Sequence, residues 1–229
     1  TQNLGSDFFS YGLGRITLGL GVGSTSLGYW DDIKFEAIPP TVPSLGAPVV
    51  LSSSQIMWPI VPPNNDFFGY DVADAAGTIK SPQWPATGWL GHAATSWTET
   101  GLTANTQYTR KIRAWNGTLN SALWSGASTV RTLSVAPTAA GVTADRTIAC
   151  RDSSVVWSAA GGFGAGRVSY YEYAWNQTPT YTFGGSEPQW SSGTLSLTAS
   201  APGTWYLHVR GFNGDDVPNG TYAYAITVP

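Results

Sequence analysis

Charged residues are scarce in this sequence, and their scarcity excludes several classes of protein. Asp, Glu, Lys and Arg make up only 11% of the 229 residues, and Lys occurs only three times, whereas about 25% is usual for soluble domains. With a net charge of −3 the chain offers no basic surface to phosphates, so we exclude nucleic acid as a partner. No apolar run approaches the roughly 18 residues of a membrane-spanning helix, so we expect no transmembrane segment.

Cysteine and histidine are also rare. The single cysteine, Cys150, allows no disulfide within the chain, and we expect it to be buried as a small apolar side chain. The two histidines, His92 and His208, lie far apart in the sequence, and neither belongs to a recognisable nucleophile–base motif. We expect His92 in a loop and His208 at a surface position of its strand.

The carboxylates are dispersed. Asp31-Asp32 and Asp215-Asp216 are the only acidic doublets, and adjacent residues of a strand point to opposite faces, which makes a doublet alone a poor calcium cage. The remaining carboxylates do not suggest a glycosidase pair. We therefore predict no catalytic residue, no metal site and no cofactor, and we predict that the protein is not an enzyme.

Aromatic residues, glycine and proline are abundant: the chain has 11 Trp, 11 Tyr, 8 Phe, 27 Gly and 15 Pro. Turn signals recur every eight to twelve residues, and no long 3.6-residue period occurs, so we predict an all-β fold. Low charge with this composition is typical of extracellular, β-rich surface proteins. The sequence does not begin with Met, and its first residues do not resemble a signal peptide. We therefore expect a mature or partial product of a longer precursor.

Two proline-containing breaks, at 38–48 and 134–138, divide the chain into segments 1–38, 39–135 and 136–229. The two later segments share their landmarks in the same order. The matching pairs are Ser54–Trp58 with Ser153–Trp157, Pro82–Trp84 with Pro188–Trp190, and Tyr108–Gly117 with Trp205–Gly214. These matches predict two copies of one supersecondary plan, hence two tandem β-sandwiches.

Residues 39–135 resemble a fibronectin type III domain. Trp58 stands where that family has the Trp of its second strand, Gly69–Val72 matches the third strand, and Leu102–Tyr108 matches the Leu-x-x-x-Thr-x-Tyr corner. The sequence departs from the family at Arg110, where an apolar residue is usual. A lone buried guanidinium is not tolerated, so Arg110 must either turn out at a bulge or find a partner inside.

Residues 136–229 resemble the Ig-like repeats of large bacterial surface proteins through Gly203–Arg210. Strand alternation places one set of side chains inward, namely Trp205, Leu207, Val209 and Gly211. It places the other set outward, namely Tyr206, His208, Arg210 and Phe212.

Segment 1–38 resembles the closing strands of a laminin-G or concanavalin-A-like jelly roll, and we expect it to form a β-hairpin. Two strands alone are marginal in water, so their apolar side chains need a partner surface. We expect either the remnant of a jelly roll or strands that are stabilised between subunits. The candidate intersubunit residues are Ile16, Leu18, Leu20, Val22, Tyr29, Trp30, Ile33 and Phe35.

The large aromatic residues outnumber what two sandwich cores need. Exposed aromatic groups mark contact or ligand surfaces, and we assign a protein-contact or glycan surface to Trp84, Trp89, Trp97, Trp115, Trp190, Tyr206 and Phe212. The sequence thus predicts a non-catalytic structural protein of the cell surface or exterior, a self-assembling subunit of a homopolymeric fibre, sheath or layer. The alternative is a carbohydrate-binding or spacer module of a secreted polysaccharide-active enzyme or an adhesin.

Overall fold

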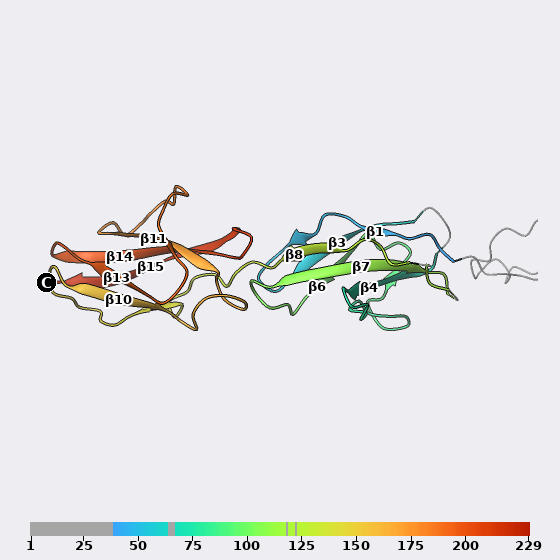
Figure 1. The fold of residues 1–229 in the computed structure, drawn as a ribbon, viewed down its shortest axis with the longest axis horizontal. Helices are drawn as coiled ribbons and strands as arrows, with labels where there is room; N and C mark the ends of the chain where they lie inside the picture. The colour runs from blue at the N-terminus through green and yellow to red at the C-terminus, as the bar shows by residue number, and fades with distance from the viewer. Residues whose placement is uncertain (1–38, 64–66, 118, 122) are drawn as a thin grey trace, which may run out of the picture. The chain divides into compact units, whose positions relative to one another are not determined.

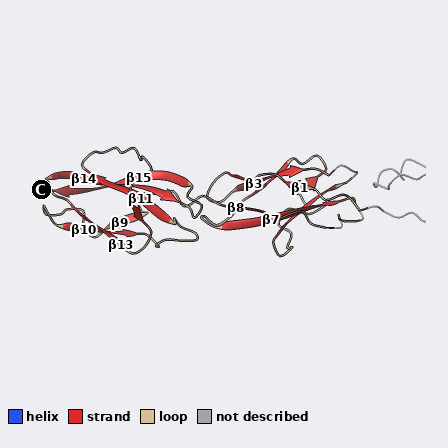
Figure 2. Ribbon diagram, turned by 45° about the horizontal axis from the view of Figure 1, so that its top comes forward, coloured by secondary structure: helices blue, strands red, loops and turns tan. Residues whose placement is uncertain are grey.

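The computed structural model describes residues 39–63, 67–117, 119–121 and 123–229. All regular elements in these residues are β-strands, as Figure 2 shows, and they include no helix long and apolar enough to cross a membrane. The predicted all-β class is therefore confirmed. The predicted N-terminal hairpin, with its eight candidate intersubunit residues, lies outside the described residues.

The first eight strands form two antiparallel sheets (Figure 1), which we call the first sandwich. One sheet has the order β1–β3–β2, with β6 also paired to β3, and the other has the order β5–β4–β7–β8. The bounds are β1 Ser44–Leu45, β2 Val49–Val50, β3 Ile56–Val61, β4 Gly69–Asp74, β5 Leu90–Gly91, β6 Ser96–Glu99, β7 Gln107–Trp115 and β8 Ser128–Arg131.

Alternation along the strands supplies the core of the first sandwich. In β3, the side chains of Ile56, Trp58 and Ile60 are buried, whereas the residues between them are partly exposed. Ile60 packs with Val72 of β4 and Ile112 of β7 in one apolar cluster. The β-branched and aromatic residues at every second position therefore do what the sequence pattern predicts.

Arg110 lies inside this sandwich. The ladder between β4 and β7 runs in unbroken register from Gly69↔Trp115 to Asp74↔Arg110, so no bulge turns Arg110 outward. Its side chain is buried, and its Nη1 donates a hydrogen bond to the carbonyl oxygen of Thr109 at 2.8 Å. Of the two arrangements that the sequence allowed, the structure has the one with an internal partner.

The last seven strands form the second sandwich, again from two antiparallel sheets. Their orders are β13–β10–β9 and β12–β11–β14–β15. The bounds are β9 Val142–Ala144, β10 Ser154–Ala159, β11 Tyr170–Asn176, β12 Gln189–Trp190, β13 Thr194–Thr198, β14 Gly203–Phe212 and β15 Pro218–Val228.

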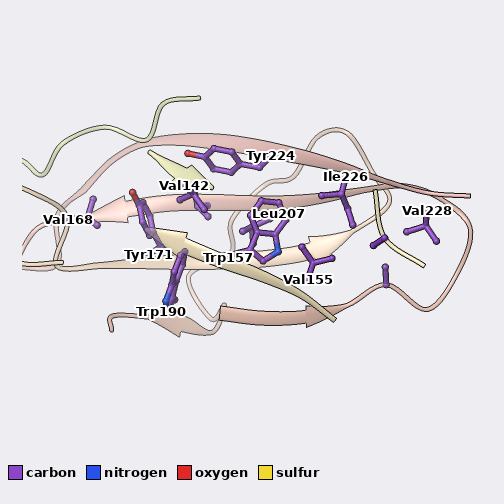
Figure 3. Packing of buried hydrophobic residues seen from close by; sticks show 13 residues of the cluster. Val142, Val155, Trp157, Val168, Tyr171, Trp190, Leu207, Tyr224, Ile226 and Val228 are labelled. Carbon is purple, nitrogen blue, oxygen red and sulfur yellow. The ribbon is translucent and has the colours of Figure 1, made fainter. Parts of the chain in front are cut away.

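The core of the second sandwich is built around Trp157 of β10. Figure 3 shows Trp157, Leu207 and Tyr224 among the buried apolar side chains that this core contains. The Trp157 ring meets that of Trp175 edge to face, with centroids 6.0 Å apart. Leu207 and Val209 are fully buried, as the alternation of β14 predicts.

The described chain divides into two compact units, each with one of the two cores. The first contains 39–47, 58–97 and 109–128, and the second contains 48–57, 98–108 and 129–229. The segment boundaries near residues 39 and 135 stay a prediction.

Cys150 corrects one expectation, because it is exposed rather than buried. It lies in the turn between β9 and β10, where its carbonyl oxygen accepts hydrogen bonds from the backbone N–H and hydroxyl of Ser153. The backbone of Cys150 thus anchors the turn, and its neighbour Ala149, rather than the thiol, enters the core.

Candidate ligand-binding site

Four aromatic rings of the first compact unit form one cluster. Phe68 stacks on Trp89 with centroids 5.0 Å apart and an interplanar angle of 17°. Trp84 meets Trp89 edge to face at 4.9 Å, and Trp115 meets Phe68 edge to face at 5.2 Å. Trp84 is 52% exposed. Edge-to-face and stacked pairs are the favourable arrangements of such rings, so the cluster fixes the orientation of an exposed indole.

The strands and one connecting segment bring these rings together. Trp115 is the last residue of β7, and its carbonyl oxygen accepts a 2.6 Å hydrogen bond from the backbone N–H of Phe68, just before β4. Trp84 and Trp89 belong to the connection between β4 and β5. There Ala86 N–H donates to the carbonyl of Gln83, and Trp89 N–H donates to that of Ala86. These two turns lie between the two indoles, whose ring centroids are 4.9 Å apart.

A pair of facing glycines makes room for Trp89. Gly69 and Gly91 lie opposite each other in the β4–β5 ladder. A Cβ atom at Gly69 would lie 2.6 Å from Cζ3 of Trp89, and one at Gly91 would lie 3.3 Å from Cη2. The indole therefore rests directly on the backbone of the sheet, a position that a side chain at Gly69 would close.

Next to the cluster lies an open hollow of about 190 Å³, lined by Asp71, Gln83, Trp84, Arg113, Trp115 and Asn120. Asp71 of β4 and Arg113 of β7 are direct cross-strand partners. Nε and Nη2 of Arg113 donate to the same oxygen, Oδ2 of Asp71, at 3.0 and 2.9 Å. The guanidinium also lies over the ring of Trp124, 4.6 Å from its centroid, which holds it in place.

This arrangement leaves polar atoms available in the hollow. Within the described part of the chain, Oδ1 of Asp71, Nη1 of Arg113 and the side-chain amides of Gln83 and Asn120 have no hydrogen-bond partner. Together they offer acceptors and donors beside an aromatic face. A saccharide ring has the complementary chemistry, because its C–H groups form an apolar face and its hydroxyls both donate and accept.

The structure brings together three of the aromatic residues that the sequence singled out: Trp84, Trp89 and Trp115. Trp97 does not join them, because it is half-buried in β6 and packs against the first core. Tyr206 is half-buried beside His208, with ring centroids 6.0 Å apart.

The expected exposure of Trp190 and Phe212 is wrong, because they are only 4% and 5% exposed. Trp190 lies opposite Tyr171 in the β11–β12 ladder and packs against Phe163 in the second core. Phe212 does share the outer face of β14 with Arg210, but the guanidinium of Arg210 lies 5.0 Å from the centroid of its ring and helps to cover it. Phe212 stacks on Tyr170 at 4.7 Å.

His208 is also buried, at 4% exposure, although its strand position was expected to face solvent. Its ring stacks with Tyr181, with centroids 5.5 Å apart, because the long connection between β11 and β12 covers this face of the sheet. Nε2 of His208 lies 3.0 Å from the carbonyl oxygen of Thr178, so this nitrogen is the donor. Burial lowers the pKa of His208 below its usual value.

Sequence reasoning missed the polar half of the site. Asp71 and Arg113 are 42 positions apart, and only the β4–β7 register shows that they face each other. Phe68 and Asn120 carry no motif, and Gln83 belongs to the Pro82–Trp84 landmark, which indicated a repeat rather than a ligand site. In the part of the chain that the structure describes, no group of His, Cys, Asp and Glu side chains could hold a metal ion.

Neither models of known protein families nor curated proteins match this sequence. Among solved structures, the chain is similar to a two-domain fibronectin type III segment of chicken tenascin, with 17% identity, 82% of this chain and 98% of that chain covered, and a TM-score of 0.49. It is also similar to the FN1-FN3 domains of chicken CNTN1, with 14% identity, coverages of 83% and 67%, and a TM-score of 0.34.

The order of the strands in the first sandwich is itself like that of a fibronectin type III fold. The sheets β1–β3–β2 with β6 and β5–β4–β7–β8 form the two layers, and Tyr108 of the predicted corner accepts a 2.8 Å hydrogen bond from the backbone N–H of Thr103. The resemblances of residues 136–229 to bacterial Ig-like repeats and of residues 1–38 to a jelly roll stay predictions.

Proposed function

We propose that this chain is a non-catalytic module of the cell exterior that binds carbohydrate through the hollow beside Trp84. One observation carries the proposal: an exposed, oriented indole adjoins a hollow whose carboxylate, guanidinium and amide atoms still have hydrogen-bonding capacity. Ligand sites combine apolar walls with a few convergent polar groups in this way. The hollow is smaller than the roughly 300–1,000 Å³ of sites that enclose drug-sized ligands, so we assign it to one sugar ring of a longer glycan.

The test is binding of the full chain to a panel of neutral and acidic polysaccharides and their oligosaccharides, followed by calorimetry on any glycan retained. Trp84→Ala and Asp71→Asn should each weaken binding, whereas Tyr222→Ala, which removes an exposed aromatic outside the hollow, should not. The proposal is wrong if the panel gives no binding, or if the Trp84 and Asp71 variants bind like the parent.

A second function, subunit of a homopolymeric surface fibre, sheath or layer, is favoured by a different observation. The described residues already form a core in each sandwich, and segment 1–38 adds eight large apolar side chains to the chain. Burying eight such side chains would contribute on the order of 10 kcal/mol, before the entropy of ordering is subtracted. We propose that this burial takes place between chains.

Deleting residues 1–38 tests the polymer. Light scattering and negative-stain microscopy should show large particles for the parent chain and monomers for the shortened chain, with the same β-sheet circular dichroism. If the shortened chain still forms the large particles, segment 1–38 is not the link, and the polymer proposal fails. A monomeric parent would instead favour the remnant of a jelly roll.

A further inference from the structure

Among the described strands, the last strand of the second sandwich has one open edge. In the sheet β12–β11–β14–β15, β15 pairs within the described residues with β14 on one side only. At its far end, the other side is covered: Thr227 N–H donates to the carbonyl of Thr147 at 2.9 Å, and Ala149 N–H donates to the carbonyl of Thr227 at 3.0 Å. Both backbone groups of Thr227 therefore point away from β14.

This contact shows which backbone groups of β15 face the open edge. In an antiparallel ladder, successive residues point their N–H and C=O alternately toward and away from the partner strand. The β14–β15 register is unbroken from Thr204↔Thr227 to Arg210↔Thr221. Like Thr227, the residues Ala225, Ala223 and Thr221 must then direct both groups outward. Among the described residues, none forms a backbone hydrogen bond with these groups.

The open edge is accessible. Thr221 and Ala225 are exposed and Ala223 is half-buried. Three outward-facing residues, spaced at every second position, are enough to pair with a strand of about five residues. Unpaired edges of this kind are templates for strand addition, and natural sheets usually protect them with charge, proline or a bulge. From Thr221 to Val228, β15 has none of these devices, because its register shift lies between Pro218 and Thr221.

A hollow lies beside the same edge. It has a volume of about 350 Å³ and is lined by Pro179, Thr180, Tyr181, Phe183, His208, Thr221, Tyr222 and Ala223. The lining has aromatic faces and contains no Asp, Glu, Lys or Arg. An added strand obtains affinity from its backbone hydrogen bonds and specificity from pockets for alternate side chains. This hollow adjoins the edge, and its uncharged lining suits an uncharged strand.

We propose that residues 16–22 of a second copy add to the open edge of β15. This inference rests on the second proposed function and names its acceptor. The segment alternates Ile16, Leu18, Leu20 and Val22 with Thr17, Gly19 and Gly21, and no charged residue occurs from 16 to 30. One face of the strand would extend the apolar layer, and the glycine face would let the backbone approach the aromatic lining closely.

The contact is head-to-tail, because the donor lies at the N-terminal side of one copy and the acceptor is the last strand of another. A heterologous contact that does not close into a ring generates a filament. Each copy would then complete the sheet of the next one, and the open edge would disappear along the polymer.

The experiment uses two full-length variants and their mixture. Ala225→Pro removes an outward N–H from the acceptor edge without removing a bond to β14, and Ala225→Ser is its matched control. Leu18→Asp introduces a charge into the donor segment. Sedimentation velocity should show polymers for the parent and for Ala225→Ser, and monomers for each of the other two variants alone.

The mixture gives the decisive result. Ala225→Pro retains a functional donor and Leu18→Asp retains a functional acceptor, so together they should form one-to-one dimers that grow no further. A monomeric mixture, or an Ala225→Pro chain that polymerises like the parent, overturns the assignment of the edge but not the polymer itself. A monomeric parent overturns both. If Ala225→Pro loses the near-UV circular dichroism of the parent, Thr221→Pro blocks the same edge.

Discussion

Trp89 lies so close to Gly69 that a Cβ atom at Gly69 would lie 2.6 Å from Cζ3 of the indole, and it would also clash with the carbonyl oxygen of Leu90. The absence of a side chain at one strand position thus decides where an aromatic ring of the site lies.

Gly69→Ala should therefore displace Trp89 and destabilise the protein. Overpacking of this kind costs about 1–3 kcal/mol, and the displaced ring should also weaken any glycan bound in the adjoining hollow. Gly126→Ala is the matched control, because a Cβ there would meet nothing within 4 Å. Urea unfolding measures both free energies of unfolding. Equal stability of the two variants would contradict the close packing.

Among the residues of the second core named above, Trp157 should be the one whose truncation lowers the free energy of unfolding most. It is buried, and its Nε1 has no hydrogen-bond partner among the described residues. Trp157→Ala should lower the free energy of unfolding by about 3–5 kcal/mol, because it leaves a large cavity. Trp157→Phe should cost less, since it fills part of that cavity and removes the unpaired N–H.

The control for this pair is Leu123→Ala at an exposed position, which should change the free energy of unfolding by less than about 0.5 kcal/mol. Thermal and urea unfolding, followed by circular dichroism, give all three values. A Phe variant that is less stable than the Ala variant would contradict the prediction.

Tyr70 should make stability depend on alkaline pH. Burial raises the pKa of its hydroxyl to about 12 from an ordinary 10, and the hydroxyl has no hydrogen-bond partner in the described part of the chain. Because the folded-state pKa is the higher one, the stabilisation is complete below pH 10 and is lost as the pH rises toward about 12.

Tyr70→Phe removes both the ionisation and the unpaired hydroxyl. Its free energy of unfolding at pH 7 should be equal to or above that of the parent. Between about pH 9.5 and about pH 11.5, a range that spans the titration, its free energy of unfolding should fall less than that of the parent. Tyr222→Phe, at an exposed position, serves as the control. A parallel pH dependence in parent and Tyr70→Phe would show that other groups cause the loss.

Glu187 should titrate at an unusually low pH. Its carboxylate accepts backbone hydrogen bonds from Gly184, Gly185 and Ser186. These bonds lower the pKa of Glu187 to about 2, and the bond from Gly184 has the largest effect. The hydroxyl of Tyr181 also donates to it, at 3.1 Å.

Because the pKa is depressed in the folded protein, the carboxylate holds the β11–β12 connection in place above about pH 4.5 and releases it as the pH falls toward 2. Carboxyl ¹³C chemical shifts should give a midpoint near pH 2 for Glu187. In Glu187→Gln the Tyr181–His208 contact should loosen at neutral pH, measured as a changed His208 ring shift. An ordinary midpoint near 4.5 would contradict the hydrogen bonds.

Local patterns in the sequence determined the all-β class and much of the two cores. Ile56, Trp58 and Ile60 are buried because a strand turns every second side chain to the same face. The same rule placed Leu207 and Val209 inside. It gave the correct face for Phe212 but not its exposure, because Arg210 and Tyr170 cover the ring on that face.

Tertiary structure decided the rest, for reasons that no local pattern contains. Asp71 meets Arg113 only through the register of two strands, and His208 is buried only because a connection without regular structure folds over its strand. The open edge of β15 follows from which strand ends the sheet. Side-chain alternation acts over a few residues and can be derived from sequence, whereas register, loop paths and sheet edges depend on contacts between residues that are distant in the chain.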